Sequence, residues 1–528
     1  MSISGLPVSQ GDSREATDSR GPRWLPALVA ALVSVVIYGV TIRGTFVLDD
    51  EAFARDDVRL LSPRASLSLW TSQYVPHALD HTWRPLLSLS YAIHHWTTGK
   101  NPMPFHAANI LLFAATAAAV AEFARRLVGL RAAWIAGLLF AALPAHVEAV
   151  ALVVGRAETE CALAMLCGLC LFLKQPLTGG RIVGILACYL LALLTKEHGL
   201  LFPIFLLALW PVWRQRARQS GLQQRRQLQW LAAGVFWVMA VYGIYREEMI
   251  GFPWNLNKMY WTYNPIIRST GWDRVLMPVA LFGRYLALLV FPAKLSPDYG
   301  TLAIGWQIHA SDPHLYVGIV GILTWIVLLA IGARRRNWRM LFCLVGFAAS
   351  LLLVLNVFII NAGAIFGERL AFVPSIFFVI LVAMGLARLP IRALAPIVGV
   401  LVVAGGVRSF AYARQWNDPL TFLDRASEAQ PKSWVLYDFR YEQYKLHGDW
   451  KGARRVAEEA IAALPQIPTP YVREVEACVK LHDFPAARVA MAKGKTIVPP
   501  SEFPWTMMDQ MIQDAQAKAG AMTRPDQP

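Results

Sequence analysis

Three adjacent acidic side chains, Asp49, Asp50 and Glu51, follow directly on the first long apolar segment of the chain. That segment, residues 24–42, is long enough to cross a bilayer. Ionised groups at a membrane surface are costly unless they have a partner or a task. A carboxylate in this position is well placed to take the proton of an acceptor hydroxyl beside a lipid-anchored donor. The alternative is a solvated acidic loop without a chemical role.

The composition indicates a membrane protein, because 56% of the 528 residues are apolar and only 16% are charged. Apolar runs of about 17–25 residues recur along most of the chain. The net charge of +15 comes largely from arginines grouped in short loops at 125–131, 214–226 and 334–339. Such clusters are typical of cytoplasmic loops. No basic face of a soluble domain is visible, so the charge indicates topology rather than nucleic-acid binding.

The apolar runs predict a disordered cytoplasmic N-terminus at 1–23, followed by a membrane domain at 24–410 with about eleven spans. We expect the spans near 24–42, 104–123, 132–152, 157–173, 182–195, 198–213, 228–246, 314–333, 338–358, 370–387 and 391–410. The loops 43–103 and 247–313 then lie on the non-cytoplasmic side. The apolar stretch 275–293 would reverse the later loops if it crossed. It is therefore predicted to be re-entrant or to lie on the outer surface.

From about residue 411 the sequence becomes that of a soluble helical protein with a period of 34 residues. Small residues recur at this period, as Ala453 and Ala487 do. An aromatic residue and a proline recur as well, at Trp416, Trp450 and Phe484 and at Pro431, Pro465 and Pro499. The pattern predicts tetratricopeptide-like helical pairs over 411–517, which form concave protein-binding surfaces, and a disordered end at 518–528.

Several short motifs also follow one another in a characteristic order along the membrane domain. They are Phe46-Val47-Leu48-Asp49-Asp50, Trp83-Arg84-Pro85-Leu86, Phe105-His106, Pro144-Ala145-His146-Val147-Glu148, Gly155-Arg156-Ala157-Glu158, Lys196-Glu197, Gly283-Arg284-Tyr285 and Glu368-Arg369-Leu370. In this order the chain resembles the transmembrane and tetratricopeptide-repeat-containing O-mannosyltransferases, membrane enzymes of the C-type glycosyltransferase fold. Its repeat tail is much shorter than those of the animal proteins, and Leu143 replaces the usual histidine of its motif.

The resemblance implies an all-α, polytopic membrane protein that moves a mannose-like sugar from polyprenyl or dolichyl phosphate to a hydroxyl of a protein or glycan. Such a reaction needs a base at the acceptor and positive charge on the departing phosphate. The resemblance implies Asp49, or else Asp50, as the base. Acceptor-side or supporting roles are implied for Glu51, Arg84, His106, His146, Glu148 and Glu158. The phosphate would be held by Arg156, Lys196, Arg284 or Arg369.

Each of these cations has an alternative role in a structural salt bridge, for example Lys196 with Glu197. Glu148, Glu158 and His146 would either bind a divalent metal ion or form a buried hydrogen-bond network, so the metal remains open. No tightly bound cofactor is expected beyond the lipid-linked donor. The expected partners are the bilayer, this donor, and a protein acceptor or partner bound through the tail, with no nucleic acid.

Two other functions compete with the transferase: a transporter or flippase, and an inactive scaffold that uses its repeats. The charges gather at one predicted face rather than at mid-membrane, which favours surface chemistry. Short loops without a disulfide framework favour a bacterial inner membrane, with the acidic loop and the repeats in the periplasm.

Overall fold

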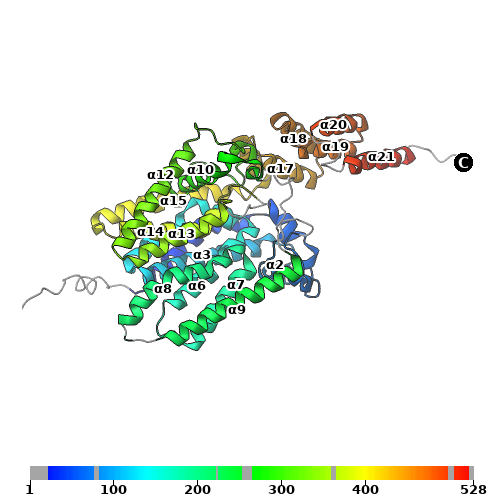
Figure 1. Ribbon diagram of the computed structural model, residues 1–528. Helices are drawn as coiled ribbons and strands as arrows, with labels where there is room; N and C mark the ends of the chain where they lie inside the picture. The colour runs from blue at the N-terminus through cyan, green and yellow to red at the C-terminus, as the bar shows by residue number, and fades with distance from the viewer. Residues whose placement is uncertain are drawn as a thin grey trace, which may run out of the picture.

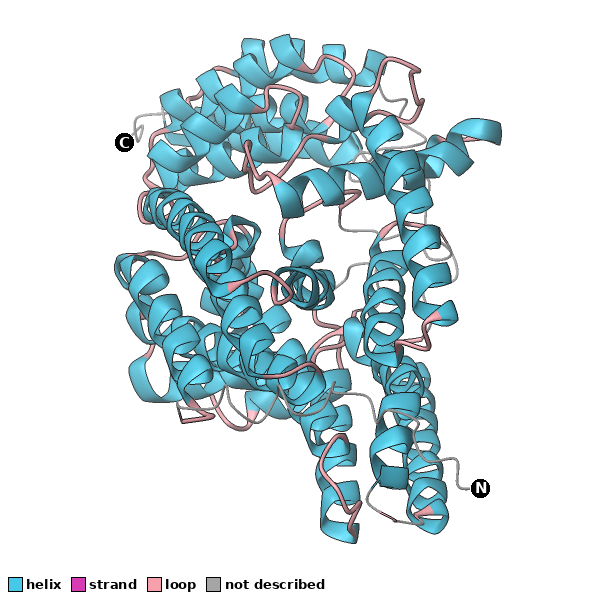
Figure 2. Cartoon of the chain, turned by 90° about the vertical axis from the view of Figure 1, so that its left-hand side faces the viewer, coloured by secondary structure: helices cyan, strands magenta, loops and turns pink. Residues whose placement is uncertain are grey.

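The computed structural model describes residues 22–75, 82–219, 221, 224–251, 264–357, 364–497 and 505–522 (Figure 1). Within these ranges the regular elements are helices and no strand occurs (Figure 2), which confirms the predicted all-α class. The predicted disorder at 1–21 and 523–528, and the repeat position Pro499, lie outside the described residues.

The membrane domain comprises the first fifteen helices of the described chain. Their bounds are α1 Leu25–Tyr38, α2 Pro85–Thr98, α3 Pro102–Leu127, α4 Leu130–Ala142, α5 Val147–Ala151, α6 Arg156–Phe172, α7 Gly179–Thr195, α8 Phe202–Gln219, α9 Arg225–Ile250, α10 Gly271–Val290, α11 Thr301–Ile304, α12 Pro313–Arg334, α13 Trp338–Val354, α14 Phe372–Leu386 and α15 Ile391–Gln415. Short 3₁₀ turns join several of them at the site, where the chain changes direction between long helices.

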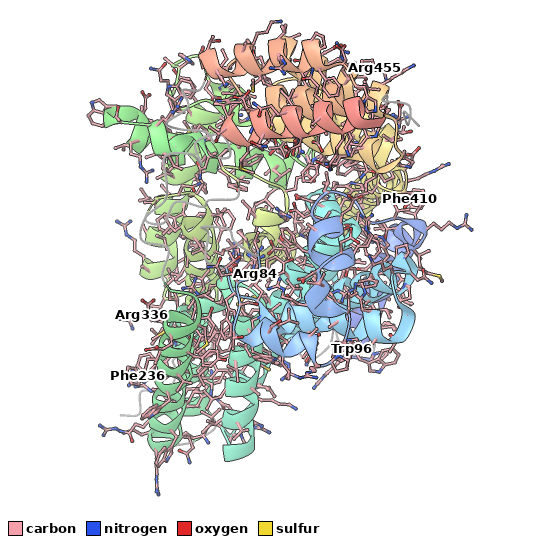
Figure 3. All side chains as sticks on the ribbon, turned by 90° about the vertical axis from the view of Figure 1, so that its right-hand side faces the viewer. Arg84, Trp96, Phe236, Arg336, Phe410 and Arg455 are labelled. Atoms are coloured by element: carbon pink, nitrogen blue, oxygen red, sulfur yellow. The ribbon has the colours of Figure 1, made fainter. Side chains whose placement is uncertain are left out.

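Six helices in the described part are long and apolar enough to cross a membrane: Leu25–Arg43, Pro102–Leu127, Arg225–Ile250, Pro313–Arg334, Arg369–Leu386 and Ile391–Gln415. A bent pair, Leu130–Ala142 and Pro144–Ala151, meets at 57° and is a seventh candidate. Large apolar side chains such as Phe236 and Phe410 project from the surface (Figure 3), as they do on helices that face lipid. The chain is a multi-pass membrane protein.

The remaining predicted spans are also helical, but they form shorter or more polar helices. Both α7 and α13 are 17 residues long. Helix α6 has the same length and begins with the charged residues Arg156 and Glu158, and α8 ends among arginines. Sequence hydropathy predicted these segments as spans, and they are helices that fall outside the six span candidates by length or polarity.

The predicted surface segment 275–293 corresponds to α10, which packs along α12 (Figure 1). The two backbones touch at a pair of glycines. A Cβ at Gly283 would overlap the carbonyl oxygen of His314, and a Cβ at Gly318 would overlap that of Val279. Glycine at both positions therefore permits this close approach, as small residues do between membrane helices.

The arginine clusters and the acidic motifs lie at opposite ends of the same helices. Helix α4 starts in the first cluster and leads to the turn before Glu148, while α8 starts just after Glu197 and ends in the second cluster. The Arg216 guanidinium donates a hydrogen bond to the Arg126 carbonyl, which joins two of the clusters. The repeat domain extends from the other end of the molecule (upper right in Figure 1).

The tail consists of helices α16 Pro419–Ala429, α17 Trp434–Leu446, α18 Trp450–Ala463, α19 Thr469–Lys480, α20 Phe484–Ile497 and α21 Trp505–Met522. The predicted period matches this order, because Trp450 and Phe484 are the first residues of α18 and α20. Ala453 and Ala487 are fully buried at the helix contacts. Helix α21 continues to Met522, five residues beyond the predicted boundary at 517.

Candidate active site

Asp50 is completely buried and is bound by backbone groups of another part of the chain. Its Oδ2 accepts hydrogen bonds from Val153 N at 3.0 Å and Val47 N at 3.4 Å, and its Oδ1 accepts one from Val154 N at 2.8 Å. Burial raises the pKa of Asp50 to about 7, although these hydrogen bonds favour the charged form. The carboxyl thus joins the acidic loop to the turn that begins α6.

Asp49, its neighbour, is open to solvent, with a side chain that is 35% exposed. Its Oδ2 lies 3.5 Å from Arg369 Nη1. The residue before it, Leu48, has a left-handed backbone with φ of 54°, which is rare for a leucine and costs about 1–3 kcal/mol. Strain of this kind clusters at functional sites, where surrounding contacts hold it in place.

Arg369 lies between two carboxylates at the start of the turn that leads into α14. Its backbone N donates to Glu148 Oε2 at 2.9 Å, and its Nε lies 3.4 Å from Glu148 Oε1. The side-chain contacts to Asp49 and Glu148 are both longer than a strong charge-assisted hydrogen bond of about 2.8 Å. With 31% of its side chain exposed, this guanidinium is held loosely and accessibly.

A second group of charges adjoins the first. Arg84 binds Glu197 with two parallel hydrogen bonds, Nε to Oε1 at 3.1 Å and Nη2 to Oε2 at 2.7 Å. Lys196 forms a buried ion pair with Glu158. Burial alone would raise the pKa of Glu197, but the Arg84 guanidinium outweighs it and lowers the pKa to about 2. Arg84, labelled in Figure 3, is partly buried, with 18% of its side chain exposed.

The partners in this second group differ from those that chain proximity predicts. Lys196 pairs with Glu158 rather than with its neighbour Glu197, and Glu197 instead binds Arg84. Adjacent residues at a helix end diverge as the chain turns into the next 3₁₀ segment, so sequence neighbours do not face each other.

Four predicted site residues lie outside this arrangement. Arg156 is buried, and its guanidinium donates to Asn109 Oδ1 at 2.8 Å, to Ser90 Oγ at 3.0 Å and to the Phe105 carbonyl at 3.0 Å. Arg284 pairs with Asp312 at the start of α12, with Nη2 and Oδ2 2.8 Å apart. These contacts leave both arginines engaged in helix packing rather than directed at the site.

The two predicted histidines also hold the bundle together. His146 contacts the Phe140 carbonyl through Nδ1 at 2.9 Å and Ser375 Oγ through Nε2 at 2.8 Å. His106 contacts the Thr45 carbonyl through Nε2 at 3.2 Å. Within the described residues, no group of three histidine, cysteine, aspartate or glutamate side chains is arranged to hold a metal ion.

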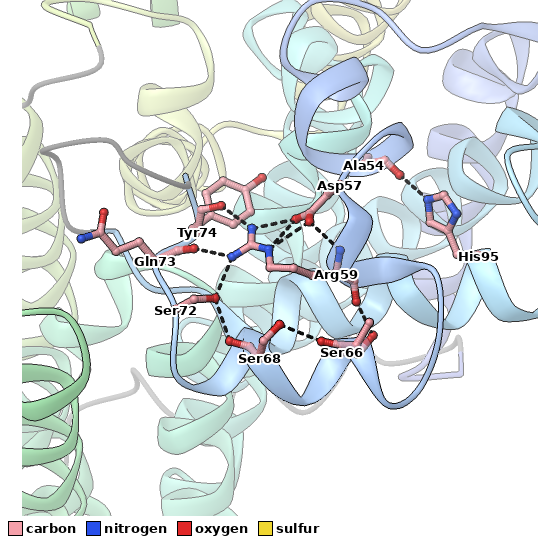
Figure 4. Close-up of polar contacts among 10 residues, drawn as sticks. Ala54, Asp57, Arg59, Ser66, Ser68, Ser72, Gln73, Tyr74 and His95 are labelled. Carbon is pink, nitrogen blue, oxygen red and sulfur yellow. Dashed lines mark hydrogen bonds and ion pairs between the residues drawn. The ribbon is translucent and has the colours of Figure 1, made fainter.

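Sequence reasoning missed Arg59, which fixes the loop that follows the acidic residues (Figure 4). Its guanidinium binds Asp57 at 2.7 Å, Ser72 Oγ at 2.8 Å, and the carbonyls of Gln73 and Tyr74 at 2.6 and 2.9 Å. One partly buried arginine thus joins residues that are up to fifteen positions apart in this loop. An Asp-x-Arg pattern in a loop was the available signal, but it is too common to single out.

No protein-family model matches the chain. Curated relatives are similar to it over parts of its length. Protein O-mannosyl-transferase TMTC2 of Mus musculus is 27% identical over 308 residues, 54% of this chain and 35% of the relative. Tmtc1 of Drosophila melanogaster is 30% identical over 295 residues, 52% and 34% of the two chains.

The resemblance is to the TMTC protein O-mannosyl-transferases. This confirms the family similarity predicted from the motifs. Mus musculus TMTC1 is 35% identical over a shorter stretch of 176 residues, which is 30% of this chain and 18% of the relative. The chain spans about a third of the length of the first two relatives. A solved structure, ArnT from Cupriavidus metallidurans bound to undecaprenyl phosphate, aligns with a TM-score of 0.44 at 17% identity over 84% of this chain and 80% of that one.

Proposed function

We propose that the chain is a membrane glycosyltransferase of the C-type fold. It transfers a mannose-like sugar from a polyprenyl-phosphate donor to a hydroxyl of a protein or glycan acceptor. The observation that carries the proposal is Arg369, accessible and loosely held between Asp49 and Glu148. A partly exposed carboxylate beside a partly exposed guanidinium supplies the two groups that this reaction needs. The names of the relatives support the sugar and the acceptor class.

In the proposed reaction Asp49 takes the proton of the acceptor hydroxyl as its oxygen attacks the anomeric carbon of the sugar. The bond from that carbon to the phosphate oxygen breaks, and the electron pair leaves with the polyprenyl phosphate. Arg369 binds the phosphate oxygens, with two parallel hydrogen bonds in its favoured geometry. Glu148 holds the backbone and side chain of Arg369 in place. Arg84 and Lys196, each tied to a carboxylate, support the surrounding loops.

We further propose that this site and the repeat domain lie on the non-cytoplasmic side, in the periplasm if the membrane is a bacterial inner membrane. The support is the placement of the arginine clusters at the opposite helix ends, together with the tendency of such clusters to stay in the cytoplasm. A polyprenyl donor would then reach Arg369 from the bilayer, and a protein acceptor would reach Asp49 from the aqueous side.

The test is a donor assay on the full chain in lipid nanodiscs, with radiolabelled polyprenyl-phosphate mannose first and the glucose and arabinose donors after it. Wild type is expected to release polyprenyl phosphate and label an acceptor. Arg369→Ala is expected to lower turnover by about 10²–10³-fold, the usual cost of a lost charge-stabilising donor. The control is Arg64→Ala, which removes an arginine of the 43–103 loop that takes no part in the site. Equal turnover in wild type and Arg369→Ala would overturn the proposed role of Arg369.

A further inference from the structure

Helix α17 of the repeat domain touches the acidic loop directly. Gln443, on α17 and almost completely buried, donates a hydrogen bond from Nε2 to Glu51 Oε1 at 2.8 Å. Glu51 is two residues after Asp49, and it also faces Arg55 at 3.4 Å. A side chain from the repeat domain therefore holds the loop that carries the proposed base.

The N-terminal end of α17 touches a second loop, residues 294–300, between α10 and α11. Ser433, the N-cap residue of α17, donates its hydroxyl to Asp298. Next to this contact the backbones meet, since a Cβ at Gly300 would lie 2.9 Å from the Lys432 carbonyl oxygen. Gly300 also has φ of +72°, so two separate constraints favour glycine there.

This second loop in turn holds the residue before Arg369. Glu368 is completely buried, and its Oε1 accepts hydrogen bonds from Ser296 N at 2.7 Å and from the Tyr299 hydroxyl at 2.8 Å. A continuous series of contacts thus runs from Ser433 through the 294–300 loop to Glu368 and Arg369. Both routes from α17 end within two residues of a proposed reacting group.

A tail that only recruits a partner would need a connection to the membrane domain, but not contacts with the acidic loop and with the loop that holds Glu368. We propose that α17 is a positioning element of the active site, in which Gln443 sets the loop of Asp49 and Ser433 sets the turn of Arg369. The first repeat thereby completes the site. This inference rests on the proposed function, because the positioned residues are the base and the phosphate ligand of that reaction.

The first experiment reverses one hydrogen bond. Gln443→Glu keeps the shape of the side chain, removes the donor and places a second carboxylate against Glu51. The double variant Glu51→Gln/Gln443→Glu restores a donor and an acceptor in the opposite order. The control is Gln510→Glu, the same change at an exposed position on α21. All are full-length chains in nanodiscs with polyprenyl-phosphate mannose as the donor.

We expect Gln443→Glu to lower kcat by about tenfold or more, since displacement of a reacting group by 1 Å or less has effects of this order. KM for the donor should stay within about twofold, because this route does not reach the phosphate ligand. The double variant should recover most of the lost kcat. Ser433→Ala should instead raise KM for the donor, since its route leads to Arg369.

Hydrogen exchange of the same variants separates this inference from the proposed function. Gln443→Glu should accelerate amide exchange within residues 44–56, the double variant should restore protection, and Ser433→Ala should accelerate exchange within 294–300. If wild type turns over no donor, the proposed function fails, and the exchange data still decide whether α17 positions the loops. Unchanged exchange in 44–56, or a kcat for Gln443→Glu equal to that of Gln510→Glu, would overturn the positioning role.

Discussion

Asp49 and Asp50 are identical neighbours, and the structure predicts opposite consequences for the same substitution. In Asp50→Asn, one carboxylate oxygen that accepts from Val153 or Val154 becomes an amide that cannot accept. A buried backbone donor left unsatisfied costs about 1–3 kcal/mol. Asp49 makes one ion contact, at 3.5 Å and partly exposed, so Asp49→Asn should cost less than about 1 kcal/mol.

The effects on turnover should have different causes in the two variants. Loss of a positioned general base lowers the rate by about 10²–10⁴-fold, equivalent to about 3–5 kcal/mol of activation free energy. Asp49→Asn should therefore be folded like wild type and almost inactive. Asp50→Asn should lose stability first, and any loss of activity should follow from displacement of the acidic loop.

The assay pairs the apparent melting temperature of each purified variant with its rate of polyprenyl-phosphate release at a temperature where all variants are folded. Asp56→Asn serves as a control, because Asp56 lies in the same loop, is exposed and binds only Arg55 and Lys100. The reasoning fails if Asp49→Asn retains full turnover, or if Asp50→Asn melts like wild type while turnover is lost. The second result would make Asp50 the base and its backbone contacts incidental.

Three further perturbations test the structure. The pKa of Glu197, the partner of Arg84, is lowered from 4.5 to about 2, so this ion pair stabilises the fold above pH 4.5 and the stabilisation is lost as the pH falls toward 2. The difference in melting temperature between wild type and Arg84→Gln should therefore shrink from pH 6 to pH 3. In a cysteine-free chain, a membrane-impermeant maleimide applied to spheroplasts should label Arg455→Cys and leave Arg336→Cys unlabelled; equal labelling would refute the proposed sidedness. Gly283→Ala should cost about 3 kcal/mol or more through overlap with α12, whereas Gly243→Ala, in open space on α9, should leave the melting temperature unchanged or raised.

Hydropathy and the 34-residue period predicted most of the architecture, because both are local signals. Apolar runs mark helices whatever their neighbours are, and Trp450 and Phe484 start their helices for the same capping reason, with Asp449 and Asp483 as N-caps. Length was harder to infer. A 17-residue helix such as α7 lies at the short end of the range that crosses a bilayer, and composition alone does not show whether it spans.

The site was predicted less completely, because the role of a charge depends on what faces it across the fold. Arg156 and Arg369 are equally good phosphate ligands by residue type, yet the first satisfies three buried oxygens and the second remains accessible. Asp49 and Asp50 are likewise the same residue type, yet only Asp50 accepts the hydrogen bonds of Val153 and Val154. These distinctions come from tertiary contacts more than a hundred residues apart in the chain, which one sequence does not display.

The charge balance of the site bears on how it would accept its donor. Asp49, Glu148, Glu158 and Glu197 face three cations, Arg84, Lys196 and Arg369, and each cation in this described group already has a carboxylate partner. A phosphate cannot simply add to such a site; it must replace an existing partner. The weakest contact is the 3.5 Å one between Arg369 and Asp49, since the others are shorter or reinforced by a backbone hydrogen bond. Donor binding would therefore release Asp49 from its cation and leave its carboxylate free to face the acceptor hydroxyl.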